Sequence, residues 1–299
     1  MSLADRPSKR KMSHRYEPAR RCIYCGAFRY SAEEPLRALA DEHVIPYALA
    51  KDALVLPEAS CRACERLTGR FEQIVLRGAF GLYRAAYPDA PNRKRKKFIS
   101  VKLPAGQRGG LILPARQIRA PIGKVPPGLV MYHFYAPSRP QGIPGVRELR
   151  GTYWAIAGKD ETREFVEKYG PFFIGTLNEL AFARTIAKIA HAFAIATYGL
   201  GSFKPLLLDF ILGRTDIYND LVGGEFDIPT ATPPTHVFHL EEATGCFHGE
   251  NLLAVKLRLF PQHGTPQYFI IVGSFDDSGL PTPRPCGLVP LDPPPGWNP

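Results

Sequence analysis

The chain has 299 residues, a hydrophobic fraction of 45% and a formal net charge of +10, so it can bury at least one sizeable core. Six cysteines are too few for a disulfide scaffold at this length. The N-terminal residues lack the apolar segment of a secretory signal, and no apolar run approaches the roughly 20 residues of a membrane span. These features argue against secreted and membrane-spanning classes and predict a cytoplasmic protein with no membrane partner.

The positive charge is concentrated in the first third of the chain. Residues 1–100 contain 20 Lys and Arg against 11 Asp and Glu, and the basic residues gather on both sides of the stretch from 22 to 72. Such clusters neutralise phosphates and release counterions, although they also occur as solvated tails and linkers. We expect contact with nucleic acid through Arg20, Arg21, Arg93, Lys94, Arg95, Lys96 and Lys97.

The first 87 residues predict a basic disordered tail (1–20) and then a compact module (21–87). Cys22-Ile23-Tyr24-Cys25-Gly26 is typical of a metal knuckle, whose turn needs a positive φ that Gly26 can adopt. A short β segment at 44–45 is expected to end at Pro46. A helix is expected over 62–86, capped by Ser60, although Gly69 and Gly78 weaken it. The order of these segments predicts a ββα arrangement.

The rest of the chain predicts a basic linker (88–97), an α+β domain (98–280) and a Pro-rich tail (281–299). Strands are expected at 98–103, 110–113, 129–135, 152–156, 236–240, 252–260 and 267–273. Helices are expected at 161–169 and 176–198, the second ending at Gly199. The predicted fold class is α+β, with a small N-terminal ββα-metal zinc module followed by a larger mixed domain with antiparallel strands and one long helix.

The long helix shows one apolar and one polar face. Phe182, Ile186, Ile189 and Phe193 recur at helical spacing and predict the buried side. Arg184, Lys188 and His191 lie on nearly the opposite side. We expect that side to be solvated, with phosphate contact as the alternative.

Two Cys-x-x-Cys pairs, Cys22/Cys25 and Cys61/Cys64, predict a structural zinc site. Each pair places two sulfurs on one turn, and two turns complete a tetrahedral sphere with no open position. The metal would stabilise a segment too short to form a hydrophobic core of its own.

The sequence resembles the HNH (ββα-metal) nucleases of the zinc-knuckle subgroup. The resemblance covers roughly residues 22–72 and lies in Cys-Ile-Tyr-Cys-Gly at 22–26, Glu-His-Val-Ile-Pro at 42–46 and Ser-Cys-Arg-Ala-Cys-Glu at 60–65. It implies that His43 is the general base and that Glu42 and Glu65 bind a catalytic Mg²⁺ or Mn²⁺. A histidine pKa near 6.5 suits activation of water, and carboxylates suit a hard cation.

Glu65 departs from the family pattern, because asparagine is usual at that position. A carboxylate there either preserves activity with an altered metal preference or marks a module that has lost catalysis. Asp41 competes with Glu42 as a ligand, and Glu72 is expected on the helix surface. The sequence therefore predicts a metal-dependent HNH endonuclease acting on nucleic acid, with double-stranded DNA as the expected target. The alternative is a catalytically inactive zinc-stabilised nucleic-acid-binding module.

Overall fold

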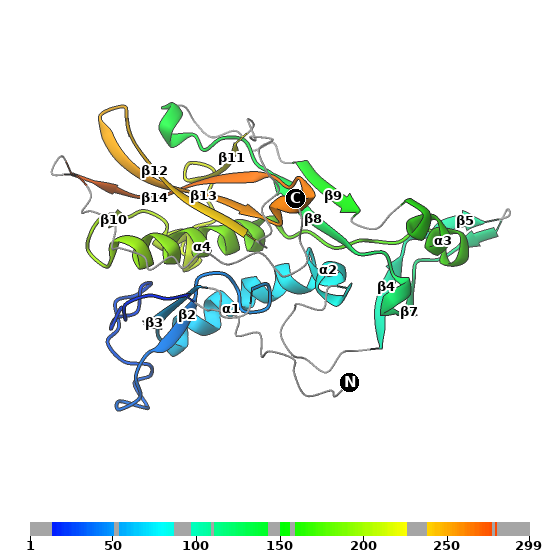
Figure 1. Cartoon of the computed structure of the whole chain (residues 1–299), viewed down its shortest axis with the longest axis horizontal. Coiled ribbons are helices and arrows are strands. Elements are labelled where there is room, and N and C mark those ends of the chain that lie inside the picture. Colours follow the sequence, from blue (N-terminus) through cyan, green and yellow to red (C-terminus); the bar gives the residue numbers. More distant parts are fainter. Residues whose placement is uncertain are drawn as a thin grey trace, which may run out of the picture.

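A computed structural model of the chain describes residues 14–50, 54–86, 97–108, 111–142, 150–155, 159–225, 238–276 and 279. Helices and antiparallel sheets are mixed along the chain, which confirms the predicted α+β class (Figure 1). The predicted tail residues 1–13, linker residues 88–96 and the tail 281–299 lie outside the described residues.

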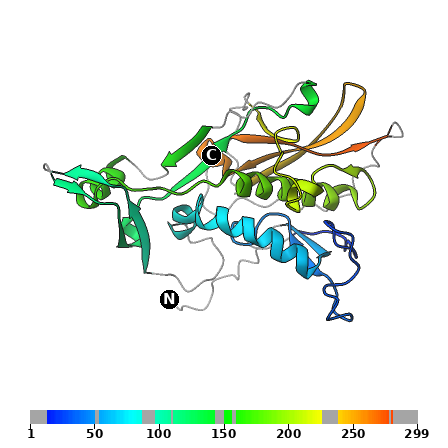
Figure 2. The same ribbon diagram turned by 180° about the vertical axis from the view of Figure 1, so that it is seen from behind.

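The largest sheet has five strands in the order β10-β14-β13-β12, with β11 also paired to β14. Its strands are β10 (Lys204–Pro205), β11 (Val222–Glu225), β12 (Phe238–Phe247), β13 (Glu250–Leu259) and β14 (Gln267–Phe275). Helix α4 (Glu179–Tyr198) lies along one side of this sheet, and the N-terminal module lies on the other side of α4 (Figures 1 and 2). A short helix, α5 (Leu208–Ile211), contacts α4.

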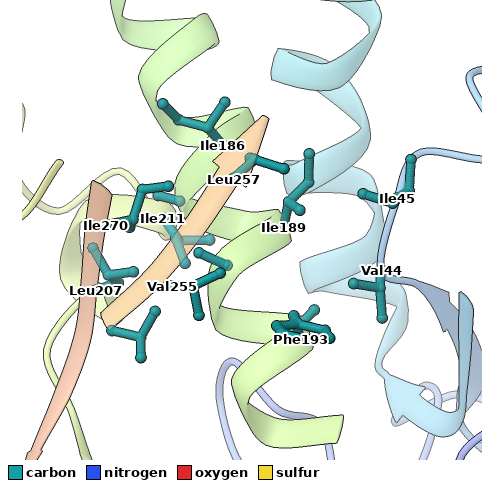
Figure 3. Close-up of a cluster of buried hydrophobic side chains, with 14 of the residues drawn as sticks. Val44, Ile45, Ile186, Ile189, Phe193, Leu207, Ile211, Val255, Leu257 and Ile270 are labelled. Atoms are coloured by element: carbon teal, nitrogen blue, oxygen red, sulfur yellow. The ribbon is translucent and has the colours of Figure 1, made fainter. Parts of the chain in front are cut away.

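Helix α4 is the centre of the main core. Every residue from Ala181 to Tyr198 except Arg184 is buried, and Figure 3 shows α4 side chains between strands of the sheet and the module. The prediction of a solvated face at Arg184, Lys188 and His191 was therefore wrong. The helix has apolar neighbours on both sides, as expected for a helix inside a large core.

Helix α4 is bounded by a capping residue, Asn178, and by Gly199. The Asn178 side chain caps the first turn by accepting a hydrogen bond from the Ala181 backbone N–H at 2.9 Å. Gly199 ends the helix with φ 91°, as the sequence predicted. By length and composition α4 also resembles a membrane span, but 89% of its most apolar window is buried inside the protein.

The N-terminal module contains a three-stranded sheet and one long helix. Strand β3 (Leu54–Ser60) pairs with β1 (His14–Arg15) in parallel and with β2 (Ala40–His43) antiparallel, and α1 (Arg62–Arg77) follows directly. The expected strand at 44–45 is wrong, because β2 ends at His43. Val44 and Ile45 instead turn into the core toward α4 (Figure 3).

The helix expected over 62–86 is divided into α1 and α2 (Gly81–Ala86). The division occurs at Gly78, where the segment before α4 crosses closely. A Cβ atom added at Gly78 would lie 2.7 Å from the Thr176 carbonyl oxygen, so only glycine allows this approach.

A separate lobe extends beside the main core (Figure 1). It contains the hairpin pairs β4 (Phe98–Leu103) with β7 (Arg116–Pro121) and β5 (Gly106–Arg108) with β6 (Leu111–Leu113), together with α3 (Lys159–Tyr169). The pair β8 (Gly128–His133) and β9 (Arg150–Ala155) connects this lobe to the rest. Strands β1, β3, β5, β7, β10 and β11 were not individually predicted.

One hydrophobic core runs through the module and the main sheet. It joins buried residues around the cysteines, such as Ile23 and Phe71, to Phe182 of α4 and Leu257 of β13. The boundary predicted near residue 87 stays a prediction, and the packing shows that the module does not have a core of its own.

Candidate metal centre and the buried charges beside it

The four predicted cysteines lie together. The sulfur atoms of Cys22, Cys25, Cys61 and Cys64 are all within 4.8 Å of one another, and Cys25 Sγ is 3.6 Å from Cys61 Sγ. Sulfurs around a tetrahedral zinc with Zn–S bonds near 2.3 Å are separated by about 3.8 Å, whereas a disulfide needs about 2.05 Å. The arrangement fits a structural zinc, and these cysteines are not joined by disulfides.

Local backbone geometry brings the two pairs together. The Gly26 N–H donates to the Cys22 carbonyl at 2.9 Å, and Gly26 has the positive φ, 76°, that the sequence predicted. The Ile23 N–H donates to Ala59 at 2.9 Å, which attaches this knuckle to β3. Cys61 then stands at the N-cap of α1, so Cys64 falls in the first helical turn.

The close sulfurs affect one another's pKa values in opposite directions. A hydrogen bond from Cys64 is the main cause that lowers the pKa of Cys22 to about 4, against the opposing effect of burial. Burial raises the pKa of Cys25 to about 11, and the hydrogen bond to Cys22 raises that of Cys64. A thiolate is the form that coordinates zinc, so Cys22 is the member of the cluster already suited to a soft metal.

Glu42, the expected cation ligand, is buried and already paired. Its side chain meets the ammonium of Lys188 from α4 at 2.5 Å, and only 6% of the residue is exposed. Burial raises the pKa of Glu42, while the attraction of Lys188 opposes that rise. The carboxylate therefore faces an internal cation rather than solvent.

Lys188 joins three parts of the protein at once. Its Nζ lies 2.9 Å from Glu72 of α1 and donates to the His43 carbonyl at 2.6 Å, in addition to its contact with Glu42. Burial alone would lower the pKa of Lys188, but the two carboxylates outweigh burial and raise it. The expectation that Glu72 is a plain helix-surface carboxylate was thus wrong.

The other two residues implied by the HNH resemblance lie near this cluster. His43 is half-buried at the end of β2, with its ring edge-on to Tyr47 at a centroid distance of 5.2 Å. Glu65 is exposed in the first turn of α1, where the Tyr30 hydroxyl donates to it at 2.8 Å.

The expected cation site on Glu42 and Glu65 does not fit this arrangement. Among the residues that the structure describes, the four cysteines form the one group of three or more His, Cys, Asp or Glu ligand atoms within 4.8 Å of one another. A cation on Glu42 would also have to replace the Lys188 ammonium. Asp41, the competing ligand, is exposed and forms an ion pair with Arg15 at 2.7 Å.

The residues expected to contact nucleic acid are exposed where the structure describes them. Arg20 and Arg21 lie beside the first knuckle, and the Arg21 guanidinium stacks over Phe28 at 4.1 Å. Lys97 is exposed at the start of the lobe. Arg93, Lys94, Arg95 and Lys96 lie outside the described residues.

His191 is a further buried group that sequence reasoning placed at the surface. Its Nε2 atom donates to the Ile23 carbonyl at 2.9 Å, and its ring centre is 5.8 Å from that of Tyr24. Burial lowers the pKa of His191 to about 4, although the Ile23 carbonyl and Cys22 favour the protonated form. The signal for this burial was present in the apolar residues that surround Lys188 and His191 along α4.

No protein-family model, no curated protein and no solved structure matches the chain. What can be assigned to the site therefore depends on its geometry. That geometry gives a four-cysteine centre suited to zinc, with a buried Glu–Lys–Glu cluster beside it that connects the module to α4.

Proposed function

We propose that the chain is an endonuclease of the HNH type, which hydrolyses phosphodiester bonds in nucleic acid with His43 as the general base. One observation carries the proposal. His43 ends the first strand of the β2–β3 pair, α1 follows β3 directly, and the four cysteines join the beginning of this unit to the start of α1. This order supports the ββα arrangement with a zinc knuckle that the sequence resemblance implies.

The surroundings of His43 suit a base. Its ring is half-buried against Tyr47, with the Nδ1 atom buried, so the ring is held in place. The Lys188 ammonium binds the His43 carbonyl and fixes the backbone from the interior. A neutral imidazole takes a proton from an attacking water, which is the role assigned to His43.

The metal expected for this hydrolysis does not fit the residues expected to bind it. Mg²⁺ or Mn²⁺ belongs to the HNH expectation, but the ion pair between Glu42 and Lys188 does not fit a cation shared with Glu65. No step is therefore assigned to a metal on these residues. Double-stranded DNA remains the proposed target because of the exposed arginines beside the knuckle.

Plasmid nicking in Mg²⁺ and in Mn²⁺ tests the base. His43→Ala is expected to reduce the nicking rate by about 100-fold or more, the lower range for loss of a general base, while zinc per chain stays at the wild-type value. His248→Asn is the matched control, since His248 is exposed on a turn of the main sheet and should nick as the wild type does. Nicking by His43→Ala at the wild-type rate would contradict the proposal.

A second function is favoured by the ion pair between Lys188 and Glu42. If that pair has permanently replaced a cation site, the module binds nucleic acid without cleaving it. This alternative predicts salt-sensitive binding and no nicking by the wild-type protein in either metal. The same plasmid assay, combined with a binding titration, therefore separates the two functions.

A further inference from the structure

The β4–β7 hairpin has two chemically different faces. On the inner face Val101 and Leu103 pack with Phe165 of α3 in a small core of their own. The register places the residues between them on the outer face, opposite their partners on β7. The outer pairs are Phe98 with Pro121, Ser100 with Arg119, and Lys102 with Gln117.

An aromatic ring and a guanidinium meet on this outer face. The Arg119 guanidinium carbon is 4.9 Å from the centre of the Phe98 ring, and 41% of Phe98 is exposed. A hollow of about 600 Å³ opens here, lined by Lys97, Phe98, Ile99, Ser100 and Arg119. The hollow therefore combines a stacking surface, two cations and a hydroxyl.

The charge around this hollow is not compensated locally. Residues 90–147 contain 12 Lys and Arg and no Asp or Glu, whereas residues 148–299 contain 11 Lys and Arg against 17 Asp and Glu. Within the part of the chain that the structure describes, no carboxylate forms an ion pair with Lys97, Lys102 or Arg119. The charge of this surface therefore favours binding of an anionic partner.

We propose that the outer face of the β4–β7 hairpin is a binding site for single-stranded nucleic acid. An unpaired base stacks on Phe98 beside Arg119, and Lys97 and Lys102 neutralise the phosphates on either side. A duplex offers phosphates, but its bases are stacked inside it and cannot stack on the exposed Phe98 ring. The site deepens the proposed function and rests on it, since the unpaired strand held here would adjoin the duplex on which the module acts.

Fluorescence anisotropy of the full chain tests the site, with labelled 20-nucleotide oligo(dT), oligo(rU) and a 20-base-pair duplex as probes. Phe98→Ala is expected to weaken binding of the better single strand at least tenfold and duplex binding less than twofold. The matched control is Tyr135→Ala, which removes an aromatic ring of similar exposure (39%) that lies outside the hairpin. Equal melting temperatures show that the variants are folded.

A second variant tests the phosphate contacts. The double change Lys97→Gln and Lys102→Gln should lower the slope of log Kd against log salt by about 1.4, since each phosphate contact on a single strand contributes about 0.7. DNA and RNA strands share this chemistry. The single-stranded probe that binds more tightly, oligo(dT) or oligo(rU), shows which of the two the site prefers. Oligo(dT) and oligo(rU) that bind Phe98→Ala as they bind the wild type would overturn the site, as would equally effective competition by poly-glutamate.

Titrations without added divalent cation separate this site from the nuclease proposal. If His43 performs no hydrolysis, binding at Phe98 is still measured. If the hairpin does not bind a strand, the His43→Ala nicking result is unaffected.

Discussion

Positive charge is buried and paired where the module contacts α4, but it is exposed on the β4–β7 hairpin. Lys188, only 2% exposed, is enclosed by Glu42, Glu72 and the His43 carbonyl. On the hairpin, Lys97, Lys102 and Arg119 are exposed, in a segment that contains no acidic residue. A charge paired in the interior fixes how elements pack, whereas an uncompensated charge at the surface remains available to an anion.

The difference also changes how the net charge is interpreted. The total of +10 combines a mildly basic stretch at 1–89, a strongly basic segment at 90–147 and an acidic remainder after it. Basic residues near the cysteines include structural ones, such as Arg15 in its pair with Asp41. The basic residues with the strongest case for a nucleic-acid role are therefore those of the hairpin.

The largest expected effect comes from disrupting the four-cysteine centre that is suited to bind zinc. Cys61→Ser should abolish stoichiometric zinc binding and lower the free energy of unfolding by more than about 5 kcal/mol, because structural zinc supplies on the order of 10 kcal/mol to small modules. The loss should extend to α4, since the module and α4 share one core. Metal analysis and denaturant unfolding measure both quantities.

Cys246→Ser is the control for this change, because Cys246 is exposed on β12 and distant in sequence from the cluster. It should leave zinc content and stability unchanged. A Cys61→Ser protein that unfolds at the wild-type denaturant concentration would show that the four-cysteine centre does not stabilise the core.

The next largest effect should come from the buried charge itself. Lys188→Met leaves Glu42 and Glu72 without their internal cation, and breaking a buried pair in this way costs about 3–5 kcal/mol. Adding Glu42→Gln to Lys188→Met removes one of the stranded carboxylates and should recover part of that loss. Urea unfolding of the single and double variants measures both effects.

Lys168→Met on α3 is the matched control, because Lys168 is exposed on a helix of the lobe. It should change stability by less than about 1 kcal/mol. If Lys188→Met were equally harmless, the contrast between paired interior charge and free surface charge would not hold.

Much of the local structure could be predicted from sequence, because it depends on neighbouring residues. The paired cysteine spacing predicted the cluster, and Gly26 predicted the turn of the knuckle. Gly199 predicted the end of α4, and β-branched runs predicted most strands of the main sheet.

What could not be predicted depends on contacts between distant segments. A polar stripe on α4 normally faces water, but here α1 covers it and supplies Glu72 to neutralise Lys188. The break at Gly78 likewise results from the approach of Thr176, almost 100 residues away. The basic hairpin is not apparent from the charge of residues 1–100, because its acid-free stretch continues to residue 147 and is followed by an acidic one.

The smallest of these effects is a pH dependence that should appear in the buried region and not in strand binding by the hairpin. The folded pKa of His191 is about 4, below the ordinary value near 6.5, so the unfolded chain binds this proton more readily than the folded one. The His191 contribution to stability should be complete above pH 6.5. It should decline as the pH falls to 4, by at most about 3 kcal/mol.

His191→Gln keeps a donor for the Ile23 carbonyl but removes the titration, so it should flatten this part of the pH profile. Urea unfolding between pH 4 and 7, with zinc measured at each pH, separates His191 from acid release of the metal. The two proteins should differ in slope only within this window, because above pH 6.5 His191 is neutral in both the folded and the unfolded chain. Parallel profiles would assign the acid sensitivity to the cysteine centre alone, and His191 would then be solvated rather than enclosed between α4 and the knuckle.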